Sequence, residues 1–575
     1  MNSENQAMSL LQNTKPQTGA KPPIPNSFTI TLINEQQAKI SPSTKEISSH
    51  LFDKIGSKYI LAENAWIFHV WSYPELEKCC SFIQKKAEGT PLCLLRALAA
   101  KYSRAAAKPK AESTLSVLEH IDGGGSIHLK PHQIEGVAVA CKRNYRLLIA
   151  DEMGLGKTLQ AIAIAKKYLE ANPNTTKRCM LIVAPASNTA MWAKEVGKYI
   201  TKRCYDIKEW RNVGDVGAHE VVALIASYNG ASSHLAQLHA EDFFMGIADE
   251  SQSLKNHESK RAQVLVPFLT RLENVILLSG TPALSNAHEL YTQIAIICPS
   301  LFSYKEYHER YCRISETHYQ AVNPRFKHLV KYRGNKNLDE LKIAVNALVL
   351  IRRVKQDCLQ LGIKRRVLVT FNTDLVKKDV QIKIQTNPKM VTNELLTEYN
   401  TAAREKISDV LNYVQQMRSK TCKKIIVFAH HRDVLDALYE EFKSRAIKID
   451  GSTPRPKREL LCDEFRENPK CDLAILSLKA CSTGLTLVCA TTVIFAELPW
   501  TPGDLHQAED RIYRIGQTET VNIYYLIASY VDKQLWPLLK RKNRTLNGIG
   551  IIEHDKENLE FETFNPKQKV MHQFK

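Results

Sequence analysis

The feature that most restricts the fold of this 575-residue chain is a glycine-containing string between an apolar run and a helix-like segment. The string occupies residues 151–158 (DEMGLGKT), residues 147–150 before it are apolar, and Leu159, Ile162 and Ala165 after it recur at helical spacing. A strand, a tight loop and a helix in this order are typical of a parallel sheet with helices on its faces. The string therefore predicts an α/β protein.

The alternation of short apolar runs with helical segments occurs twice along the chain, which predicts two α/β lobes with parallel sheets. A largely helical, polar stretch separates the two series and is interpreted as a bridge. Strands are expected at 147–150, 180–184, 221–225, 243–248 and 275–278, and then at 424–429, 447–449, 473–477, 493–496 and 521–526.

A smaller α/β module is expected before the first lobe. Phe28, Ile30 and Leu32 alternate with threonines, and Trp66 and Phe68 repeat this strand-like alternation. Polar, proline-containing residues precede the module and are predicted to be disordered. The expected parts are a tail (1–27), the module (28–90), a linker (91–127), the first lobe (128–299), the helical bridge (300–420), the second lobe (421–545) and a C-terminal tail (546–575).

The charge balance favours a polyanionic partner. Lys and Arg number 79 against 60 Asp and Glu, a formal net charge of +19, which is typical of nucleic-acid binding, although a generally basic surface is the alternative. The 14 cysteines include no C-x-x-C spacing, so we expect reduced thiols and no zinc site. Neither a secretory signal nor a bilayer-spanning apolar segment is present, so export and membrane insertion are not expected.

The string 151–158 has the composition of a loop that binds nucleotide phosphates. Gly154 and Gly156 let the backbone approach closely, so that amide groups and the helix N-terminus receive the β-phosphate. Lys157 then neutralises the β- and γ-oxygens, and Thr158 offers its hydroxyl to Mg²⁺. Asp151 replaces the first glycine of the general pattern.

A pair of carboxylates follows a later strand. Residues 243–248 are apolar and place Asp249 and Glu250 at a strand end, where Asp249 can hold Mg²⁺ and Glu250 can orient the attacking water. Such a pair alone is more often a helix cap or a solvated turn, but its place after the phosphate loop favours hydrolysis. Residues 279–282 (SGTP) follow another strand and are interpreted as coupling nucleotide state to a nucleic-acid track; the alternative is a simple tight turn.

Two arginines in the second half complete the pattern. Gln507, Arg511 and Arg514 are spaced i, i+4 and i+7, so we predict that they share one helix face. A solvated surface is one interpretation. The other is a pair of arginine fingers that reach the γ-phosphate only when the lobes close, so that hydrolysis depends on closure.

These strings, in this order, resemble the Swi/Snf-type ATPases of helicase superfamily two. The resemblance covers residues 128 to about 540 and adds residues 130–137 (KPHQIEGV) and 482–487 (STGLTL) to those above. It implies two RecA-like lobes that use ATP and Mg²⁺ to move along duplex DNA without conventional strand separation.

Within that family the chain is most similar to the HepA-related (HARP) annealing helicases, which rewind unpaired DNA and remodel stalled replication forks. The module at 28–90 resembles a single HARP domain through Trp66, Phe68 and Leu76, which implies recognition of DNA junctions; any small α/β domain is the alternative. The other strings that carry this likeness are 277–283 (LLSGTPA), 289–294 (ELYTQI), 495–500 (FAELPW) and 535–538 (LWPL).

The resemblance also implies roles for residues outside the phosphate loop. Gln133 would read adenine, and Ser187, Thr281 and Thr483 would contact DNA phosphates. The adjacent Arg352 and Arg353 resemble the paired arginines that follow the first lobe in this family, or they brace the lobes.

Several features depart from the family pattern. Gln252 stands where many relatives have His, which puts the coupling of hydrolysis to DNA in question. The tail 1–27 lacks the basic amphipathic helix that docks single-strand-binding protein, and no zinc-finger spacing occurs. Residues 568–574 partly match a sliding-clamp peptide, with an unstructured tail as the alternative.

The expected protein is thus a monomeric DNA-dependent ATPase with duplex and branched DNA as partners. The basic residues of 540–544 favour the nucleus if the source is a eukaryote. The alternatives are a chromatin remodeller that acts on nucleosomes, an RNA-unwinding enzyme and a non-catalytic DNA-binding scaffold.

Overall fold

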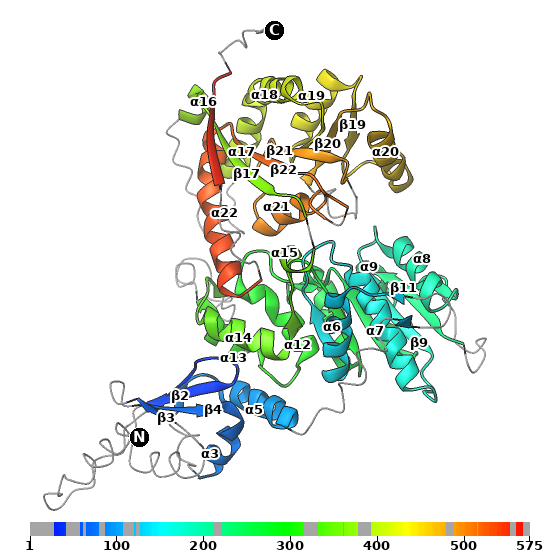
Figure 1. The fold of residues 1–575 in the computed structure, drawn as a ribbon, viewed down its shortest axis with the longest axis vertical. Helices are drawn as coiled ribbons and strands as arrows, with labels where there is room; N and C mark the ends of the chain where they lie inside the picture. Colours follow the sequence, from blue (N-terminus) through cyan, green and yellow to red (C-terminus); the bar gives the residue numbers. More distant parts are fainter. Residues whose placement is uncertain are drawn as a thin grey trace, which may run out of the picture. The chain divides into compact units, whose positions relative to one another are not determined.

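The computed structural model forms two compact units, Met1–Ala107 and Lys108–Lys575 (Figure 1). It describes residues 28–41, 58–60, 65–79, 87–106, 120–121, 127–210, 220–314, 332–359, 361–377, 393–478, 487–514, 516–551 and 559–566. The predicted tail 1–27, Thr483 and the clamp-like residues 568–574 lie outside the described residues.

The first unit is a five-stranded sheet with helices packed beside it, as the predicted α/β module requires. Its strand order is β3 (Lys58–Ile60), β4 (Ala65–His69), β2 (Gln37–Ser41), β1 (Phe28–Leu32) and β5 (Ala87–Gly89). Neighbouring strands are antiparallel except β1 and β5, which are parallel. Trp66, Phe68 and Leu76, the residues that suggested a HARP domain, are all buried in the core.

Residues 91–127 differ from the predicted linker, because Leu92–Ala106 form helix α5. Leu94, Leu95 and Leu98 recur on one face of α5 and are fully buried, so the helix belongs to the first unit. It packs against the short helix η2 (Val70–Ser72) and against α3 (Tyr73–Cys79). The alanine-rich composition of this segment suggested a linker, but alanine and leucine are strong helix formers.

The first lobe of the second unit is a parallel sheet, as predicted, but it has seven strands because β10 and β16 join the five expected ones. β9 and β12 are buried along their whole length, as expected for strands covered on both faces. The strand order is β10 (Cys204–Asp206), β11 (Val222–Ser227), β9 (Cys179–Ala184), β12 (Phe243–Asp249), β13 (Val275–Leu278), β8 (Arg146–Ile149) and β16 (Leu350–Ile351). Its helices are α6 (Pro131–Lys142), α7 (Lys157–Ala171), α8 (Thr189–Tyr199), α9 (Tyr228–Ser233), α10 (Leu235–His239), α11 (Lys260–Arg271), α12 (Tyr291–Ile297), α13 (Tyr304–Tyr311) and α14 (Leu338–Leu348), with the 3₁₀ turns η6 (Ser251–Leu254) and η7 (Ala287–Leu290).

The second lobe is also a seven-stranded parallel sheet. Its order is β19 (Ala446–Ile449), β20 (Leu473–Ser477), β18 (Lys424–Ala429), β21 (Ala490–Phe495), β22 (Val521–Ile527), β17 (Lys364–Phe371) and β23 (Leu559–Phe564). Its helices are α16 (Asp374–Lys377), α17 (Asn393–Glu405), α18 (Ile407–Lys420), α19 (Arg432–Phe442), α20 (Arg455–Glu467), α21 (Pro502–Glu509) and α22 (Tyr530–Gly548). Two-stranded ribbons pair β6 (His120–Ile121) with β7 (Ile127–His128) and β14 (Arg313–Ile314) with β15 (Tyr332–Arg333).

The lobe boundaries differ from the predicted ones because both sheets recruit strands from segments assigned elsewhere. β16 and β17 come from the predicted bridge 300–420, and β23 comes from the predicted tail 546–575. β16 has only two residues, too few to show a strand-like alternation in the sequence. β17 begins with three basic residues, so the apolar residues in its second half did not suggest a strand. β23 alternates apolar residues with Glu560 and Glu562 at the sheet edge, and its Phe564 packs against Phe371 and Tyr413.

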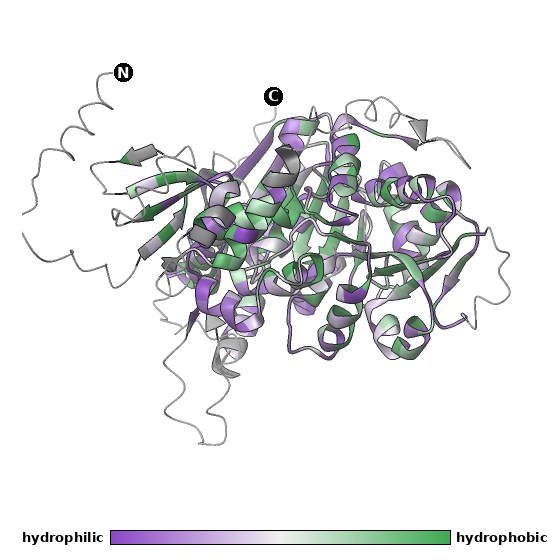
Figure 2. Cartoon of the chain, turned by 90° about the horizontal axis from the view of Figure 1, so that it is seen from below, coloured by the Kyte–Doolittle hydropathy of each residue, from purple (hydrophilic) through white to green (hydrophobic). Residues whose placement is uncertain are grey.

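Hydrophobic residues concentrate in the strands of the sheets, and hydrophilic residues lie toward the outside on the helices (Figure 2). Helix α22 packs against α21, α17 and β22 of the second lobe and against α14 of the first. The Nδ2 of Asn335 donates to Thr545 Oγ1 at 3.4 Å near the end of α22, so this helix connects the lobes. No helix in the described part of the chain is both long and apolar enough to cross a bilayer.

Glu497, just after β21, gives a testable stability prediction. Burial alone would raise its pKa, but the His431 ring, 2.6 Å away, and the charge of Lys406 outweigh burial and lower the pKa to about 2. An acid with a lowered folded-state pKa stabilises the protein above its ordinary pKa, and this stability is lost as the pH falls toward 2. We expect Glu497→Gln to lower the free energy of unfolding by roughly 3 kcal/mol at pH 7 and by less at pH 3.

Urea unfolding of wild type and variant at pH 7 and pH 3 measures this difference. Glu441→Gln, at an exposed position on α19, is the control and should change stability little at either pH. An equal loss at both pH values would mean that the ionised form of Glu497 is not what stabilises the fold.

Candidate active site

The predicted phosphate loop lies between β8 and α7, as the sequence indicates. Gly154 and Gly156 have φ angles of 89° and 77°, the left-handed region that glycine adopts without strain. Gly156 is the N-cap of α7, so the unpaired backbone N–H groups of the first helical turn begin directly after the loop. This is the geometry of an anion site at a helix N-terminus.

The Lys157 ammonium is held inside the loop. Its Nζ donates to the backbone carbonyls of Asp151 at 2.8 Å and Glu152 at 3.2 Å. Burial lowers the pKa of Lys157, and the charges of Glu250, Asp151 and Asp249 oppose this change. A buried cation whose direct partners are neutral carbonyls is well suited to an anionic ligand such as a phosphate.

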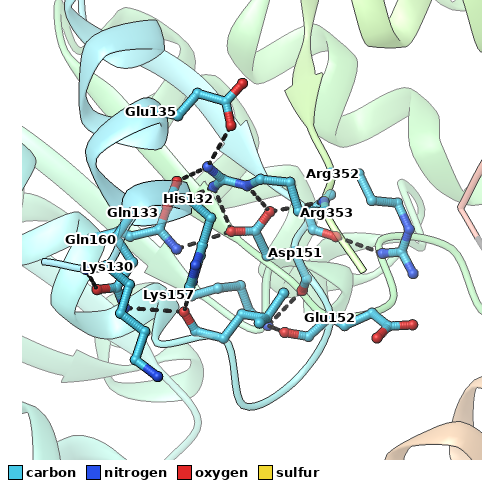
Figure 3. A network of polar contacts seen from close by, with 12 residues as sticks. Lys130, His132, Gln133, Glu135, Asp151, Glu152, Lys157, Gln160, Arg352 and Arg353 are labelled. Carbon is cyan, nitrogen blue, oxygen red and sulfur yellow. Dashed lines mark hydrogen bonds and ion pairs between the residues drawn. The ribbon is translucent and has the colours of Figure 1, made fainter. Parts of the chain in front are cut away.

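The Asp151 carboxylate anchors the phosphate loop to neighbouring side chains, and the predicted place of Asp151 in the nucleotide site stays a prediction. Its carboxylate accepts hydrogen bonds from Arg353 Nε at 2.9 Å and Nη2 at 2.6 Å, and from Gln160 Nε2 at 2.9 Å (Figure 3). Asp151 is fully buried, so the ion pair with Arg353 compensates a charge that would otherwise be costly. An aspartate thus replaces the usual first glycine because it ties the loop to the chain after the first lobe.

Gln133 on α6 lies against the phosphate loop. Its Nε2 donates to the Leu155 carbonyl at 3.2 Å, and its Oε1 accepts from Lys130 N at 2.9 Å (Figure 3). A Cβ at Gly156 would overlap the Gln133 amide, so this glycine also provides space. The predicted adenine contact of Gln133 remains a prediction.

The two predicted carboxylates stand at the end of β12. Asp249 Oδ2 accepts from Trp192 Nε1 at 3.0 Å and from Asn188 Nδ2 at 3.3 Å. Burial and the neighbouring Glu250 raise the pKa of Asp249 to about 6, although Trp192, Asn188 and Lys157 oppose the shift. Two adjacent carboxylates in a buried site create an excess of negative charge that a divalent cation would balance.

These residues fit Mg²⁺ held together with a nucleotide. Mg²⁺ typically takes one or two carboxylates and completes its shell with water and substrate phosphates. Asp249 would supply the carboxylate, and the half-buried Thr158 follows Lys157 in the first turn of α7. Among the described residues no cluster of three or more His, Cys, Asp or Glu could hold a metal by itself.

A chain of hydrogen bonds runs from Glu250 to the second lobe. Gln252 Nε2 donates to Glu250 Oε2 at 2.6 Å, and its Oε1 accepts from Ser279 Oγ at 2.6 Å. Thr281 N donates to Ser279 Oγ at 3.2 Å, and Gln507 Nε2 donates to Thr281 Oγ1 at 3.2 Å. The amide at position 252 therefore completes a path between the carboxylates and the other lobe.

The three residues predicted to contact DNA lie in different surroundings. Ser187 is half-buried after β9, and its Oγ donates to Asn188 Oδ1 at 3.0 Å. Thr281 is buried in the contact between the lobes, where its Oγ1 accepts from Gln507, and its predicted contact with DNA stays a prediction. Thr483 lies in the segment 479–486, outside the described residues.

Gln507, Arg511 and Arg514 do not share one helix face, because α21 ends at Glu509. Glu509 is fully buried and paired with Lys364 at 2.7 Å and Arg366 at 2.9 Å, which fixes the end of the helix. The chain continues in turns, and the Arg511 Nε is buried without a hydrogen-bond partner among the described residues.

The turn after α21 nevertheless reaches the phosphate loop of the first lobe. A Cβ built on Gly154 would lie 3.1 Å from Arg514 Cβ and 3.8 Å from Lys355 Cε. Burial and the neighbouring Arg511 lower the pKa of Arg514, whereas Asp510 raises it. The Arg514 side chain of the second lobe therefore lies next to the loop that contains Lys157.

Two family models match this arrangement. The SNF2-related domain matches residues 132–425, and the Helicase conserved C-terminal domain matches residues 405–516. The chain belongs to the SNF2-related family. The two matches together run from residue 132 to residue 516, which includes Gln133, the phosphate loop, the two carboxylates after β12 and the turn with Arg511 and Arg514.

Curated relatives of this SNF2-related chain include two named groups. It is 34% identical over 544 residues to "SWI/SNF-related matrix-associated actin-dependent regulator of chromatin subfamily A-like protein 1" of Xenopus laevis, covering 91% of this chain and 55% of the relative. It is 36% identical over 468 residues to "DNA annealing helicase and endonuclease ZRANB3" of Bos taurus, covering 76% of this chain and 42% of the relative. The chain thus spans about half the length of these relatives.

A solved structure titled "Sulfolobus solfataricus SWI2/SNF2 ATPase core in complex with dsDNA" aligns with 74% of this chain and 94% of its own. The identity is 20% and the TM-score is 0.34.

Sequence reasoning missed part of the site of this SNF2-related chain. The phosphate loop is held through Asp151 by Arg353 and Gln160, and the turn after α21 is held through Asp510 by Lys355. Of these three residues the sequence pointed only to Arg353, and it did not indicate that Asp151 is its partner. The string 352–355 (RRVK), directly after β16, is the signal that could have drawn attention to Lys355. Its partners lie far away in sequence, so the spacing alone could not identify them.

Gly154→Ala tests the contact between the loop and the turn. A Cβ at Gly154 would be strained at φ 89° and crowd Arg514, so we expect ATPase activity to fall on the order of 100-fold. Gly334→Ala is the control, because Gly334 has φ 73° but would meet only Arg313 at an ordinary 3.5 Å. In steady-state ATPase assays the rate of Gly334→Ala should be close to that of the wild type. An equal loss of activity in both variants would indicate that backbone strain alone is responsible.

Proposed function

We propose that this chain is an ATP-driven DNA motor that rewinds unpaired strands and remodels branched DNA such as stalled replication forks. In this proposal the first lobe binds ATP and Mg²⁺, and the second lobe supplies arginines that complete the site. DNA grip and hydrolysis are linked because both depend on the relative position of the lobes.

The observation that carries the proposal is the contact between Arg514 and Gly154 across the lobes. A phosphate site that is complete only when two lobes meet makes hydrolysis sensitive to whatever moves the lobes. Lys157 would neutralise the phosphates, Glu250 would orient the attacking water, and Arg511 and Arg514 would stabilise charge on the γ-phosphate. Asp249 and Thr158 would hold Mg²⁺, which supplies charge neutralisation between phosphate oxygens.

Duplex and branched DNA are the proposed partners. The formal charge of +19 supports a polyanionic partner, and a relative of this chain is named a DNA annealing helicase. Ser187 remains a candidate for a DNA phosphate contact. The first unit is proposed to recognise the junction; because Trp66, Phe68 and Leu76 form its core, they would act by holding that fold.

The proposed location is the nucleus if the source is a eukaryote, and the proposed state is a monomer. The basic run at 540–544 lies within helix α22, and Lys542 Nζ donates to the Trp500 carbonyl at 2.7 Å. This packing favours a structural role for part of the run over a freely accessible import signal. A sliding-clamp contact through residues 568–574 is kept as a secondary proposal.

A chromatin remodeller is the second candidate, because a relative's name includes regulation of chromatin. The same motor would then respond to nucleosomes more strongly than to naked forks. A non-catalytic scaffold is disfavoured by the complete set formed by Lys157, Asp249, Glu250, Arg511 and Arg514.

The decisive experiment compares ATP hydrolysis by the purified chain with forked DNA, linear duplex, single-stranded RNA and nucleosomes. We expect forks to stimulate turnover most, together with rewinding of a bubble and regression of a model fork. Stimulation should fall with salt as phosphate contacts are lost. Preferential stimulation by nucleosomes would favour the remodeller, preferential stimulation by RNA would favour the unwinding enzyme, and no hydrolysis with any polymer would favour the scaffold.

A variant lacking residues 1–107, the first compact unit, separates the motor from junction recognition. We expect it to keep duplex-stimulated ATPase and to lose its preference for forks. Unchanged fork regression would remove the proposed role of the first unit.

A further inference from the structure

Backbone hydrogen bonds hold residues 350–355, which lead from the first lobe to the second, against the phosphate loop. β16 pairs with β8, and beyond it Glu152 N donates to the Arg353 carbonyl at 3.0 Å. Glu152 Oε2 in turn accepts from Lys355 N at 2.8 Å. The backbone of the crossing segment, residues 350–355, therefore follows the loop residue by residue up to Lys355.

The side chain of Lys355 points away from this backbone contact to the second lobe. Its Nζ donates to Asp510 Oδ1 at 2.7 Å and to the Tyr513 carbonyl, and lies 5.6 Å from the centre of the Tyr513 ring. Only 1% of the side chain is exposed. Burial lowers the pKa of Lys355 and Asp510 opposes the shift, so the ammonium and its carboxylate depend on each other.

The two acceptors of Lys355 directly precede the two arginines. Asp510 is followed by Arg511, and Tyr513 is followed by Arg514. The Lys355 Cε and the Arg514 Cβ both lie within 4 Å of the position that a Cβ on Gly154 would take. Lys355 thus lies where three parts of the chain meet: the crossing segment, the phosphate loop and the turn 510–514, which contains both arginines.

A buried Lys–Asp pair is an expensive way to hold two lobes together, because both charges must leave water. Apolar side chains of similar volume would pack the same space at lower cost. Unlike apolar contacts, the hydrogen bonds of the ammonium are directional, so its N–H groups fix a carboxylate and a carbonyl at defined positions. That property is useful where a neighbouring side chain must be aimed accurately.

We propose that Lys355 is a positioning residue for ATP hydrolysis: it fixes the turn 510–514 against the phosphate loop and thereby aims Arg511 and Arg514 at the γ-phosphate. This inference rests on the proposed function. Lys355 itself does not contact the reacting atoms. It transmits the position of the loop to the arginines through Asp510 and Tyr513.

Lys355→Met tests the proposal in the full chain. We expect kcat for DNA-stimulated ATP hydrolysis to fall on the order of 100-fold, while the KM for ATP changes by less than about threefold, because nucleotide binding relies on the first lobe. Lys406→Met is the matched control. The Lys406 side chain is buried like that of Lys355 and pairs with Asp532 at 2.9 Å, but wholly within the second lobe.

Both variants should lose thermal stability to a similar extent, so turnover is compared at a temperature at which circular dichroism shows both to be folded. If Lys355→Met does not fold, Asp510→Asn is used, because the amide keeps an oxygen for Lys355; kcat should then fall about tenfold. Turnover by folded Lys355→Met or Asp510→Asn equal to that of Lys406→Met would overturn the proposal. Absence of hydrolysis in the wild type would instead reject the proposed function.

Discussion

Replacing Arg511 by alanine is expected to lower the kcat of DNA-stimulated ATP hydrolysis about 10³-fold, the effect of removing an arginine that stabilises transition-state charge. The guanidinium is buried, and its Nε has no hydrogen-bond partner among the described residues. A buried donor without a partner is costly, so a ligand that supplies an acceptor would offset that cost. The KM for ATP should change little if the contact is made mainly in the transition state.

Two further variants sharpen the Arg511 experiment. Arg511→Lys keeps the charge but loses the planar fork, so it should recover only a small part of the activity. Arg203→Ala removes a surface arginine that pairs with Glu220 at the edge of the first lobe and should be neutral. Wild-type turnover by Arg511→Ala would show that the second lobe does not complete the site.

Lys157→Ala should reduce ATP hydrolysis by at least about 100-fold, because the cation that neutralises the β- and γ-phosphates is removed. The fold should persist, since alanine is a good residue for the first turn of α7 and the lost ammonium is a buried charge bonded to carbonyls. DNA binding should also persist, because the phosphate loop is not the proposed DNA contact.

Steady-state hydrolysis, nucleotide binding and fork binding by fluorescence anisotropy distinguish these expectations for Lys157→Ala. Lys167→Ala is the control on the same helix, where Lys167 forms a surface pair with Glu170. Loss of DNA binding together with hydrolysis would indicate a general defect, and retained hydrolysis would remove Lys157 from the proposed chemistry.

The sequence predicted the two parallel sheets because their central strands are short apolar runs with a clear boundary. The runs at 180–184 and 243–248 correspond to β9 and β12 to within one residue, and both strands are buried on both faces. It did not predict β17, because Lys364 and Arg366 at its start look like a charged surface. Their partner, Glu509, is a buried carboxylate that only the folded lobe brings to them.

For the candidate site, the sequence indicated the residue types more fully than their arrangement in space. Gly154, Gly156, Lys157 and Asp249 follow strands, and the ends of parallel strands necessarily meet at one edge. The helix expected through Arg514 ends at Glu509 because tertiary contacts to Lys364 and Lys355 override helical spacing. Contacts such as Lys355 to Asp510 join residues 155 positions apart, a separation that no local pattern encodes.

The position of β23 has a consequence for biosynthesis. β17 is made about two hundred residues before the strand that covers its outer side, and Phe564 of that strand packs 4.8 Å from Phe371 and 5.0 Å from Tyr413. A nascent chain on the ribosome therefore carries an uncovered parallel strand until residues 559–564 emerge. Premature termination before Leu559 would leave that strand open to pairing with other chains, so such truncated products should depend on chaperones or aggregate.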